Sequence, residues 1–282
     1  MRNRKTVGGT IFRVFAYTVC IFLAIISILP FWVMLVNATR STWQVQSSAF
    51  ALIPSTHLMD NLDVLLGKTF DPITGLANSM IISLGATACT IYFSALTAYA
   101  LIAYNWKLRN AFFTLIMAVM MIPAQITIIG FYKFMYQIGM TNNFLALILP
   151  AIAAPPAVFF MRQFMVAALP MELLEAARID GSSEFFTFNR IVIPIMMPAL
   201  ATQAIFTFVF NWNNLFLPMV LLTQSDKYTM PIMVSLLKGD IYKTEYGAVY
   251  LGLALTVLPL FIIYFLLSKY IIAGVALGGV KG

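Results

Sequence analysis

Long runs of apolar residues, separated by short polar segments, dominate this 282-residue chain. Within each run the apolar residues follow one another directly and do not alternate with polar residues, as they do in membrane-spanning strands. A spanning helix needs about 20 apolar residues. The pattern predicts six such helices, over residues 14–36, 77–103, 110–130, 144–162, 191–222 and 247–268. It therefore predicts an all-α, multi-pass membrane protein with a single transmembrane domain over residues 1–282.

The composition excludes a water-soluble protein. Hydrophobic residues make up 61% of the chain and charged residues 10%, whereas soluble domains carry about 25% charged residues. A soluble fold of this length would not have enough polar surface to cover its core. The two cysteines, Cys20 and Cys89, both fall inside predicted spans and indicate neither a disulfide framework nor a metal site.

The distribution of charge predicts the orientation in the membrane. If the N-terminus is cytoplasmic, the inner segments contain eleven of the 17 Lys and Arg residues and four of the ten acids. The whole formal charge of +7 then lies on the inner side, as the positive-inside rule prefers. Both termini are therefore expected in the cytoplasm, and the basic balance gives no indication of a nucleic-acid partner.

The first apolar run and the polar segment that follows it each need a separate interpretation. The first apolar run follows several basic residues and resembles a secretory signal, but its apolar core is longer than the roughly 7–15 residues of a signal. We expect an uncleaved first helix. The segment 37–76 is too polar to span, and its string HLMDNLDVLLGKTF predicts a short helix at the outer interface or against the outer ends of the bundle.

Small residues and prolines indicate how the spans pack. The second predicted span is rich in Gly, Ala, Ser and Thr, which let helix backbones approach closely in lipid and favour a central position. Proline interrupts helical hydrogen bonding. Prolines occur near the end of the third span, within the fourth and towards both ends of the fifth: Pro123, Pro150, Pro155, Pro156, Pro194, Pro198 and Pro218. Kinked or interrupted helices are predicted there.

Several kinds of functional group do not occur in the predicted spans. No Asp, Glu, His, Lys or Arg lies at mid-membrane depth, although proton-driven carriers bury such groups. The sequence contains no nucleotide-binding loop, no nucleophile–base pair and no metal-ligand cluster. We therefore expect no enzymatic activity and no cofactor in this chain, and a partner protein that supplies the energy for any transport.

Residues 170–194, PMELLEAARIDGSSEFFTFNRIVIP, hold four of the ten acids between two apolar runs. Pro170 suits the first turn of a helix, good helix formers follow it, and Gly181 suits the left-handed residue at which helices end. Ser182 or Ser183 can then cap a second helix that leads into the fifth span. The pattern predicts a helix about 15 Å long over residues 170–181.

This predicted helix has the features of a docking segment. Four residues share one face by their three- and four-residue spacing: Leu173, Ala176, Ala177 and Asp180. The alanines would let a partner approach the backbone, and Glu175 can pair with Arg178 or point outward. The alternative is an amphipathic loop on the bilayer, which the acids disfavour because the cytoplasmic leaflet is itself anionic. We expect a segment that docks a cytoplasmic protein.

The string ELLEAARIDGSSEFFTFNRIVIPIMMPAL resembles the signature of inner-membrane permeases of binding-protein-dependent ABC transporters. That signature consists of Glu-Ala-Ala, a later glycine and then an apolar residue before a proline. It maps to Glu175, Ala176, Ala177, Gly181 and Ile193-Pro194. The rest of the chain is similar to the carbohydrate branch and its smaller maltose-type permeases, through ALTAYAL at 95–101, MRQF at 161–164, NWNNLFLP at 211–218 and AGVALGGVKG at 273–282. The resemblance covers nearly the whole chain.

The resemblance implies a type I ABC-importer permease fold in the bacterial plasma (inner) membrane. It implies a heterodimer with a second, homologous permease, two ATPase subunits that bind ATP and Mg, and an extracytoplasmic sugar-binding protein. The segment 170–181 would be the coupling helix, whose ATPase-coupling residues are Glu175, Ala176, Ala177, Arg178, Asp180 and Gly181. The tail residues Gly278, Gly279 and Lys281 would contact the ATPases, with a frayed terminus as the alternative.

Amide and aromatic side chains are the candidates for the substrate path: Gln125, Tyr132, Asn211, Trp212, Asn213 and Asn214. An aromatic face can stack on a sugar, and amides can both donate and accept hydrogen bonds. The alternative is that these aromatic residues form an interfacial belt or pack in the bundle. The resemblance also implies that the partner permease makes most of the sugar contacts.

We therefore expect the channel-forming subunit of an ATP-driven importer of a carbohydrate, specifically an oligosaccharide. One alternative is a self-contained secondary sugar carrier, which would show internal repeats and buried ionisable groups. The other is a membrane scaffold that transports nothing.

Overall fold

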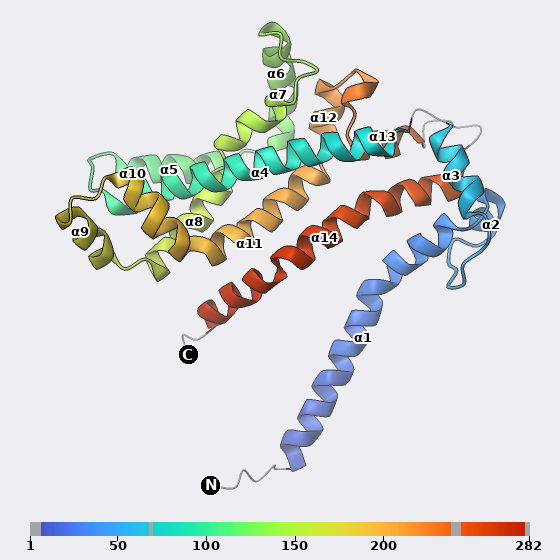
Figure 1. Cartoon of the computed structure of the whole chain (residues 1–282), viewed down its shortest axis with the longest axis horizontal. Coiled ribbons are helices and arrows are strands. Elements are labelled where there is room, and N and C mark those ends of the chain that lie inside the picture. The colour runs from blue at the N-terminus through green and yellow to red at the C-terminus, as the bar shows by residue number, and fades with distance from the viewer. Residues whose placement is uncertain (1–6, 68–69, 238–243, 280–282) are drawn as a thin grey trace. The chain divides into compact units, whose positions relative to one another are not determined.

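The computed structural model describes residues 7–67, 70–237 and 244–279 of the chain. Throughout these residues the backbone forms helices and loops without a strand, so the all-α prediction is confirmed (Figure 1). Within them, five segments are long and apolar enough to cross a membrane: Phe12–Ala38, Pro72–Ala103, Leu145–Ala168, Glu184–Trp212 and Tyr246–Leu266. The expected third span is represented by a shorter apolar helix, Arg109–Met120.

The chain divides into two compact units. One consists of residues 1–70 and 234–257, and the other of residues 71–233 and 258–282. Two of the three boundaries between these units fall inside continuous helices and not in linkers. One lies in α13 (Met230–Leu237) and the other in α14 (Tyr246–Gly279). The single transmembrane domain therefore stays a prediction.

The first unit begins with α1 (Val7–Ala38), α2 (Thr42–Ser47) and α3 (Leu58–Leu66). The side chain of Asn61 in α3 donates hydrogen bonds to the carbonyl oxygens of Ala38 (2.8 Å) and Arg40 (2.9 Å). Carbonyls at a helix C-terminus have no partner within the helix, so Asn61 satisfies them and holds α3 to the end of α1. The short helix that the polar segment 37–76 predicts is therefore present as α3, while its place at the interface stays a prediction.

The second unit is built around α4 (Pro72–Ala103). Asp71 caps this helix by accepting hydrogen bonds from the N–H groups of Ile73 and Thr74. Small residues of α4 are fully buried, among them Ala86, Ser94, Ala95 and Ala98. They allow α8 (Pro155–Ala168) and α11 (Ile193–Trp212) to pack directly against α4. In this unit α4 has the central position that its small residues predict.

Prolines divide the chain where the hydropathy pattern predicts continuous spans. The range 110–130 is two helices, α5 (Arg109–Met120) and α6 (Ala124–Gln137), because Pro123 lacks an N–H group and takes an extended backbone with ψ 123°. The fourth run consists of α7 (Leu145–Ile148), a 3₁₀ turn η1 (Leu149–Ile152) and α8, with the break just before Pro155. A residue before proline avoids the helical region.

The expected fifth span is also divided. It begins as α10 (Glu184–Thr187), continues through a π-helical turn η2 (Phe188–Val192) into α11 and ends at Trp212. A separate helix, α12 (Phe216–Leu221), follows and leads to a 3₁₀ turn η3 (Ser225–Lys227). Figure 1 shows α6, α7 and α12 gathered on one side of α4, where α12 contacts both α6 and α7.

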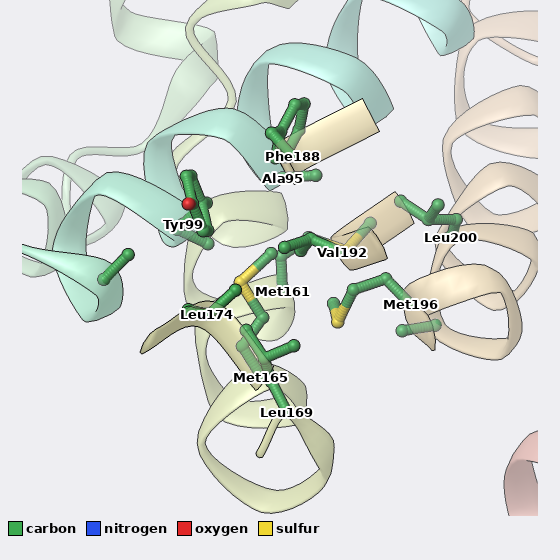
Figure 2. Packing of buried hydrophobic residues seen from close by; sticks show 13 residues of the cluster. Ala95, Tyr99, Met161, Met165, Leu169, Leu174, Phe188, Val192, Met196 and Leu200 are labelled. Atoms are coloured by element: carbon green, nitrogen blue, oxygen red, sulfur yellow. The ribbon is translucent and has the colours of Figure 1, made fainter. Parts of the chain in front are cut away.

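The largest buried cluster of the second unit joins α4, α8, α9 (Met171–Ile179) and α11. Its centre contains three methionines, Met161, Met165 and Met196, each completely buried. Leu174 of α9 and Tyr99 of α4 belong to the same cluster (Figure 2). Methionine is unbranched and fills irregular gaps, so this core accommodates helices that meet at different angles. It also fixes α9 to the ends of α4 and α8.

Candidate functional site

The acidic segment forms a short exposed helix, α9, held between two turns. Pro170 stands at its N-cap with ψ 123°, and Glu172 lies in the first turn, where the helix dipole favours an acid. The helix ends in a Schellman motif, in which Ser182 N–H donates to Ala177 O (2.9 Å) and Gly181 N–H donates to Arg178 O (3.1 Å). Gly181 has φ +76°, a left-handed conformation that glycine adopts without strain. The helix thus lies where the sequence predicts it.

The inner and outer faces of α9 differ from the expected ones at one position. Leu174 and Ala177, three residues apart, point into the protein and are 0% and 7% exposed. The exposed residues of the segment include five of the six predicted coupling residues: Glu175, Ala176, Arg178, Asp180 and Gly181. Ala177 was expected beside Ala176 on a docking face, but it packs inward because it lies one turn after Leu174.

Arg178 also has an inward-directed role that the sequence did not predict. Its Nε donates to Glu184 Oε1 (2.8 Å) and its Nη2 to the carbonyl oxygen of Ala103 (3.1 Å). The second carboxylate oxygen of Glu184 accepts a hydrogen bond from the Tyr99 hydroxyl (2.7 Å). Arg178 therefore pairs with Glu184 and not with Glu175, which has no ion pair among the described residues.

This environment further stabilises the positive charge that Arg178 carries at neutral pH in any case. The hydrogen bond to Glu184 raises the pKa of the guanidinium above its ordinary value, and the guanidinium lies 5.4 Å from the centre of the Tyr104 ring. Burial, followed by the neighbouring Glu184 carboxylate, raises the pKa of the Tyr104 hydroxyl. At neutral pH, Arg178 is therefore a cation and the Tyr104 hydroxyl is neutral.

The turn after α9 leads directly into the spanning helix. Ser183 caps α10, with its hydroxyl accepting from Phe186 N–H (3.4 Å), so the second of the two predicted serines is the cap. The π-helical turn follows, in which Ile193 N–H donates to Phe188 O. An α-helical register would place the ring of Pro194 against the carbonyl of Arg190, and a π turn before it relieves that conflict.

A second feature of this unit is a cavity of about 460 Å³ between α4, α8, α11, α12 and η1. Its volume is within the range of about 300–1,000 Å³ that is typical of ligand sites. The described residues that line it are apolar or carry amide and hydroxyl groups, and none is charged. The polar ones come from α4, from the second half of α11 and from the loop after it: Thr90, Gln203, Thr207, Asn211 and Asn214.

The predicted substrate-path residues have different surroundings. Asn211 and Asn214 line the cavity, and the Asn211 amide donates to Thr207 O (2.8 Å). Trp212 is 1% exposed and stacks on Phe208, with ring centres 5.5 Å apart, so it packs in the protein interior. Asn213 is exposed and donates to Val209 O (3.0 Å) outside the cavity lining.

The remaining candidates lie elsewhere. Tyr132 packs against the cluster around Met135 on α6 and does not line the cavity. The side chain of Gln125 and the whole of Lys281 lie outside the described residues, while Gly278 and Gly279 form the last described residues of α14. Sequence reasoning missed Thr90, Gln203 and Thr207, because single polar residues in an apolar run give no signal of a shared cavity.

Comparison with known proteins identifies the class. The family described as "Binding-protein-dependent transport system inner membrane component" matches residues 90–276. The chain belongs to this family, and it is accordingly a permease subunit of the inner membrane and not an enzyme.

Two curated relatives illustrate the similarity. The chain is 36% identical to the arabinooligosaccharides transport system permease protein AraQ of Halalkalibacterium halodurans, over 93% of this chain and 94% of that protein. It is 33% identical to the lactose transport system permease protein LacG of Rhizobium radiobacter, over 94% of this chain and 95% of that protein.

A third relative and one solved structure complete the comparison. The chain is 31% identical to the sn-glycerol-3-phosphate transport system permease protein UgpE of Escherichia coli, over 93% of this chain and 95% of that protein. Its fold matches a chain of a bacterial ABC transporter involved in the import of the acidic polysaccharide alginate, with a TM-score of 0.78, 20% identity and coverage of 96% and 100% of the two chains. The fold is therefore that of an ABC-importer permease.

Proposed function

We propose that this chain forms one half of the membrane channel of an ATP-driven importer and that its substrate is a neutral oligosaccharide. The observation that carries the substrate class is the cavity, whose described lining offers amides, hydroxyls and aromatic rings without a charged residue. Amides and hydroxyls match sugar hydroxyls as donors and acceptors. A phosphate ester or an acidic sugar would call for Arg or Lys, so the lining favours the neutral sugars that two of the relatives' names specify.

The energy enters through the outward face of α9. In this proposal two ATPase subunits bind ATP and Mg and dock on this face, a second permease completes the channel, and an extracytoplasmic binding protein delivers the sugar. Exposure of Glu175, Ala176 and Asp180, together with Ile179 at 86% exposure, supports a docking surface of mixed acidic and apolar character. The tail residues Gly278, Gly279 and Lys281 would provide a further contact with the ATPases.

Uptake by proteoliposomes that contain the complete complex tests the transport proposal. We expect ATP-dependent uptake of a labelled oligosaccharide and none of labelled sn-glycerol-3-phosphate. Uptake without ATP would indicate a secondary carrier, and no uptake of any substrate would indicate a scaffold. Selective uptake of the phosphate ester would contradict the substrate class.

Charge reversal on α9 tests the docking face. Glu175→Lys is expected to weaken ATPase association by about tenfold, since a charge reversed at an interface opposes its complementary partner. Asp63→Lys makes the same change on α3, at an exposed position on the predicted outer side. It should leave ATPase association unchanged.

A further inference from the structure

Three side chains from three helices meet where α9 joins the membrane part of the chain. Arg178 belongs to the last turn of α9, Glu184 is the first residue of α10, and Tyr99 lies near the C-terminal end of α4. Two other ion pairs occur among the described residues, and they join residues one or three positions apart. The pair Arg178–Glu184 is therefore the one described ion pair that connects two separate helices.

The geometry of the three side chains is directional. Each carboxylate oxygen of Glu184 has its own donor, Arg178 Nε at 2.8 Å and the Tyr99 hydroxyl at 2.7 Å. Arg178 uses a further N–H to bond Ala103 O at 3.1 Å, at the C-terminus of α4, where helix carbonyls lack internal partners. A guanidinium holds such a set of bonds at fixed angles, so α9 cannot rotate against α4 without breaking at least one of them.

Stability alone does not explain this arrangement. The side chains of Arg178 and Glu184 are 35% and 40% exposed, and ion pairs that are this exposed contribute little to folding. The apolar contacts of Leu174 and Ala177 already attach α9 to the core. Those contacts are non-directional, so they do not by themselves determine the rotation of this nine-residue helix about its axis.

The helix to which α9 is tied continues to the cavity. Tyr99 and Ala103 belong to the same unbroken α4 as Thr90, which lines the cavity. Nine residues of α-helix separate Thr90 from Tyr99, a length of about 13 Å. The described part of α4 therefore forms a rigid connection from the base of α9 to the cavity wall.

We propose that Arg178, Glu184 and Tyr99 form a positioning clamp that makes α9 move as one body with α4, so that a displacement imposed on α9 reaches the cavity wall. This inference rests on the proposed ATP-driven transport. It assigns Arg178 to the inside of the permease, whereas the sequence grouped it with the ATPase-coupling residues. None of the three residues is required to touch the ATPase or the sugar.

The clamp is tested by the ratio of sugar transported to ATP hydrolysed in the reconstituted complex. Arg178→Ala and Glu184→Ala should each lower this ratio by about tenfold, within the usual range of coupling between sites, while the ATPase remains bound and active. The double variant should lose no more than either single variant, because both changes break the same connection. Arg190→Ala, which removes an exposed arginine of the neighbouring π turn, should leave the ratio unchanged.

Tyr99→Phe distinguishes a loss of coupling from a loss of folding. It keeps the ring, which lies 5.4 Å from that of Phe188, and removes only the hydroxyl that binds Glu184. We expect a smaller fall in the transport ratio with an unchanged melting temperature. A purely structural role would instead lower the melting temperature and leave the ratio of the surviving complex intact.

A distance measurement gives an independent readout. Spin labels at Ile179 and Leu108, both well exposed, should show a narrow distribution of distances in a complex whose Cys20 and Cys89 are replaced by serine. Glu184→Ala should broaden this distribution.

Three results would overturn the clamp. The losses in transport ratio could be additive in the double variant, or the ratio could be unchanged in both single variants. The third is loss of the ATPase from the Arg178→Ala complex, which would make Arg178 a docking contact. If the unaltered complex shows no ATP-driven uptake, the proposed function itself fails, which is a distinguishable result.

Discussion

Leu174 is completely buried, whereas Glu175, the next residue along α9, is exposed. Each residue of an α-helix is rotated by about 100° from the one before it, so two neighbours face different surroundings. Leu174 therefore holds α9 to the methionine-rich core, and Glu175 remains available to a partner. The separation of these two functions on one short helix leads to the first prediction.

Leu174→Ala should destabilise the permease, because it leaves a cavity beside Met161 and Met165. Large-to-small changes in a core cost about 2–5 kcal/mol. Ile179→Ala, on the same helix but 86% exposed, should change stability by less than about 0.5 kcal/mol. Unfolding of both variants in detergent checks this, and equal effects would contradict the assignment of the buried face.

Gly181→Val should distort the end of α9. No atom lies within 4 Å of a Cβ at this position, so the obstacle is the φ of +76° and not space. A β-branched residue is strained there by roughly 1–2 kcal/mol, whereas asparagine tolerates this conformation. We expect ATPase association to weaken in Gly181→Val and to persist in Gly181→Asn. If both variants bind alike, the turn does not matter for docking.

Asn214→Leu should reduce sugar uptake through a higher apparent KM, since Asn214 lines the cavity. Loss of one hydrogen bond of about 1 kcal/mol corresponds to a rise of roughly fivefold. Asn213→Leu should have a smaller effect, because the Asn213 amide bonds to Val209 O outside the lining. Uptake at several sugar concentrations distinguishes the two, and the reverse order would argue against the cavity as the path.

Asp71 predicts a local pH dependence at the start of α4. The hydrogen bond from the Thr74 hydroxyl (2.6 Å), with those from backbone N–H groups, lowers the pKa of Asp71. Because the folded pKa lies below the ordinary one, the cap contributes fully above pH 3.8, the ordinary value, and its contribution is lost as the pH falls through the lowered pKa. Hydrogen exchange of the backbone amides of residues 73–75, corrected for intrinsic rates, should rise as the pH falls through this range.

A matched variant separates the cap from other acid effects. Asn also caps helices but does not titrate, so Asp71→Asn should remove the pH dependence and keep the first turn protected at neutral pH. An unchanged pH dependence in Asp71→Asn would show that another acid controls the exchange.

The sequence predicted the helical class, the apolar segments and the helix of the acidic region, because all three depend on local patterns. Hydropathy averaged over a run did not locate the break at Pro123, where only three residues separate α5 from α6. A short interruption hardly alters the average. The prolines themselves were the better signal, and they predicted interruption.

The site was less accessible to sequence reasoning because its contacts are non-local. Arg178 was expected near Glu175 by helix spacing, but the turn at Gly181 brings Glu184 to it, and Tyr99 comes from 85 positions away. Trp212 has the aromatic face that can stack on a sugar, but it packs on Phe208 instead. A one-dimensional pattern does not determine which side of a helix another helix covers.

Cross-linking from α9 tests the central claim most directly. A cysteine placed at Ala176, which is exposed, should react with a short bifunctional reagent and join the permease to an ATPase subunit in the assembled complex, whereas a cysteine at the buried Ala177 should react poorly. Mass spectrometry identifies the cross-linked protein. Labelling of the Ala176 cysteine by a membrane-impermeant reagent from outside the cell, or its failure to join any ATPase subunit, would contradict the account.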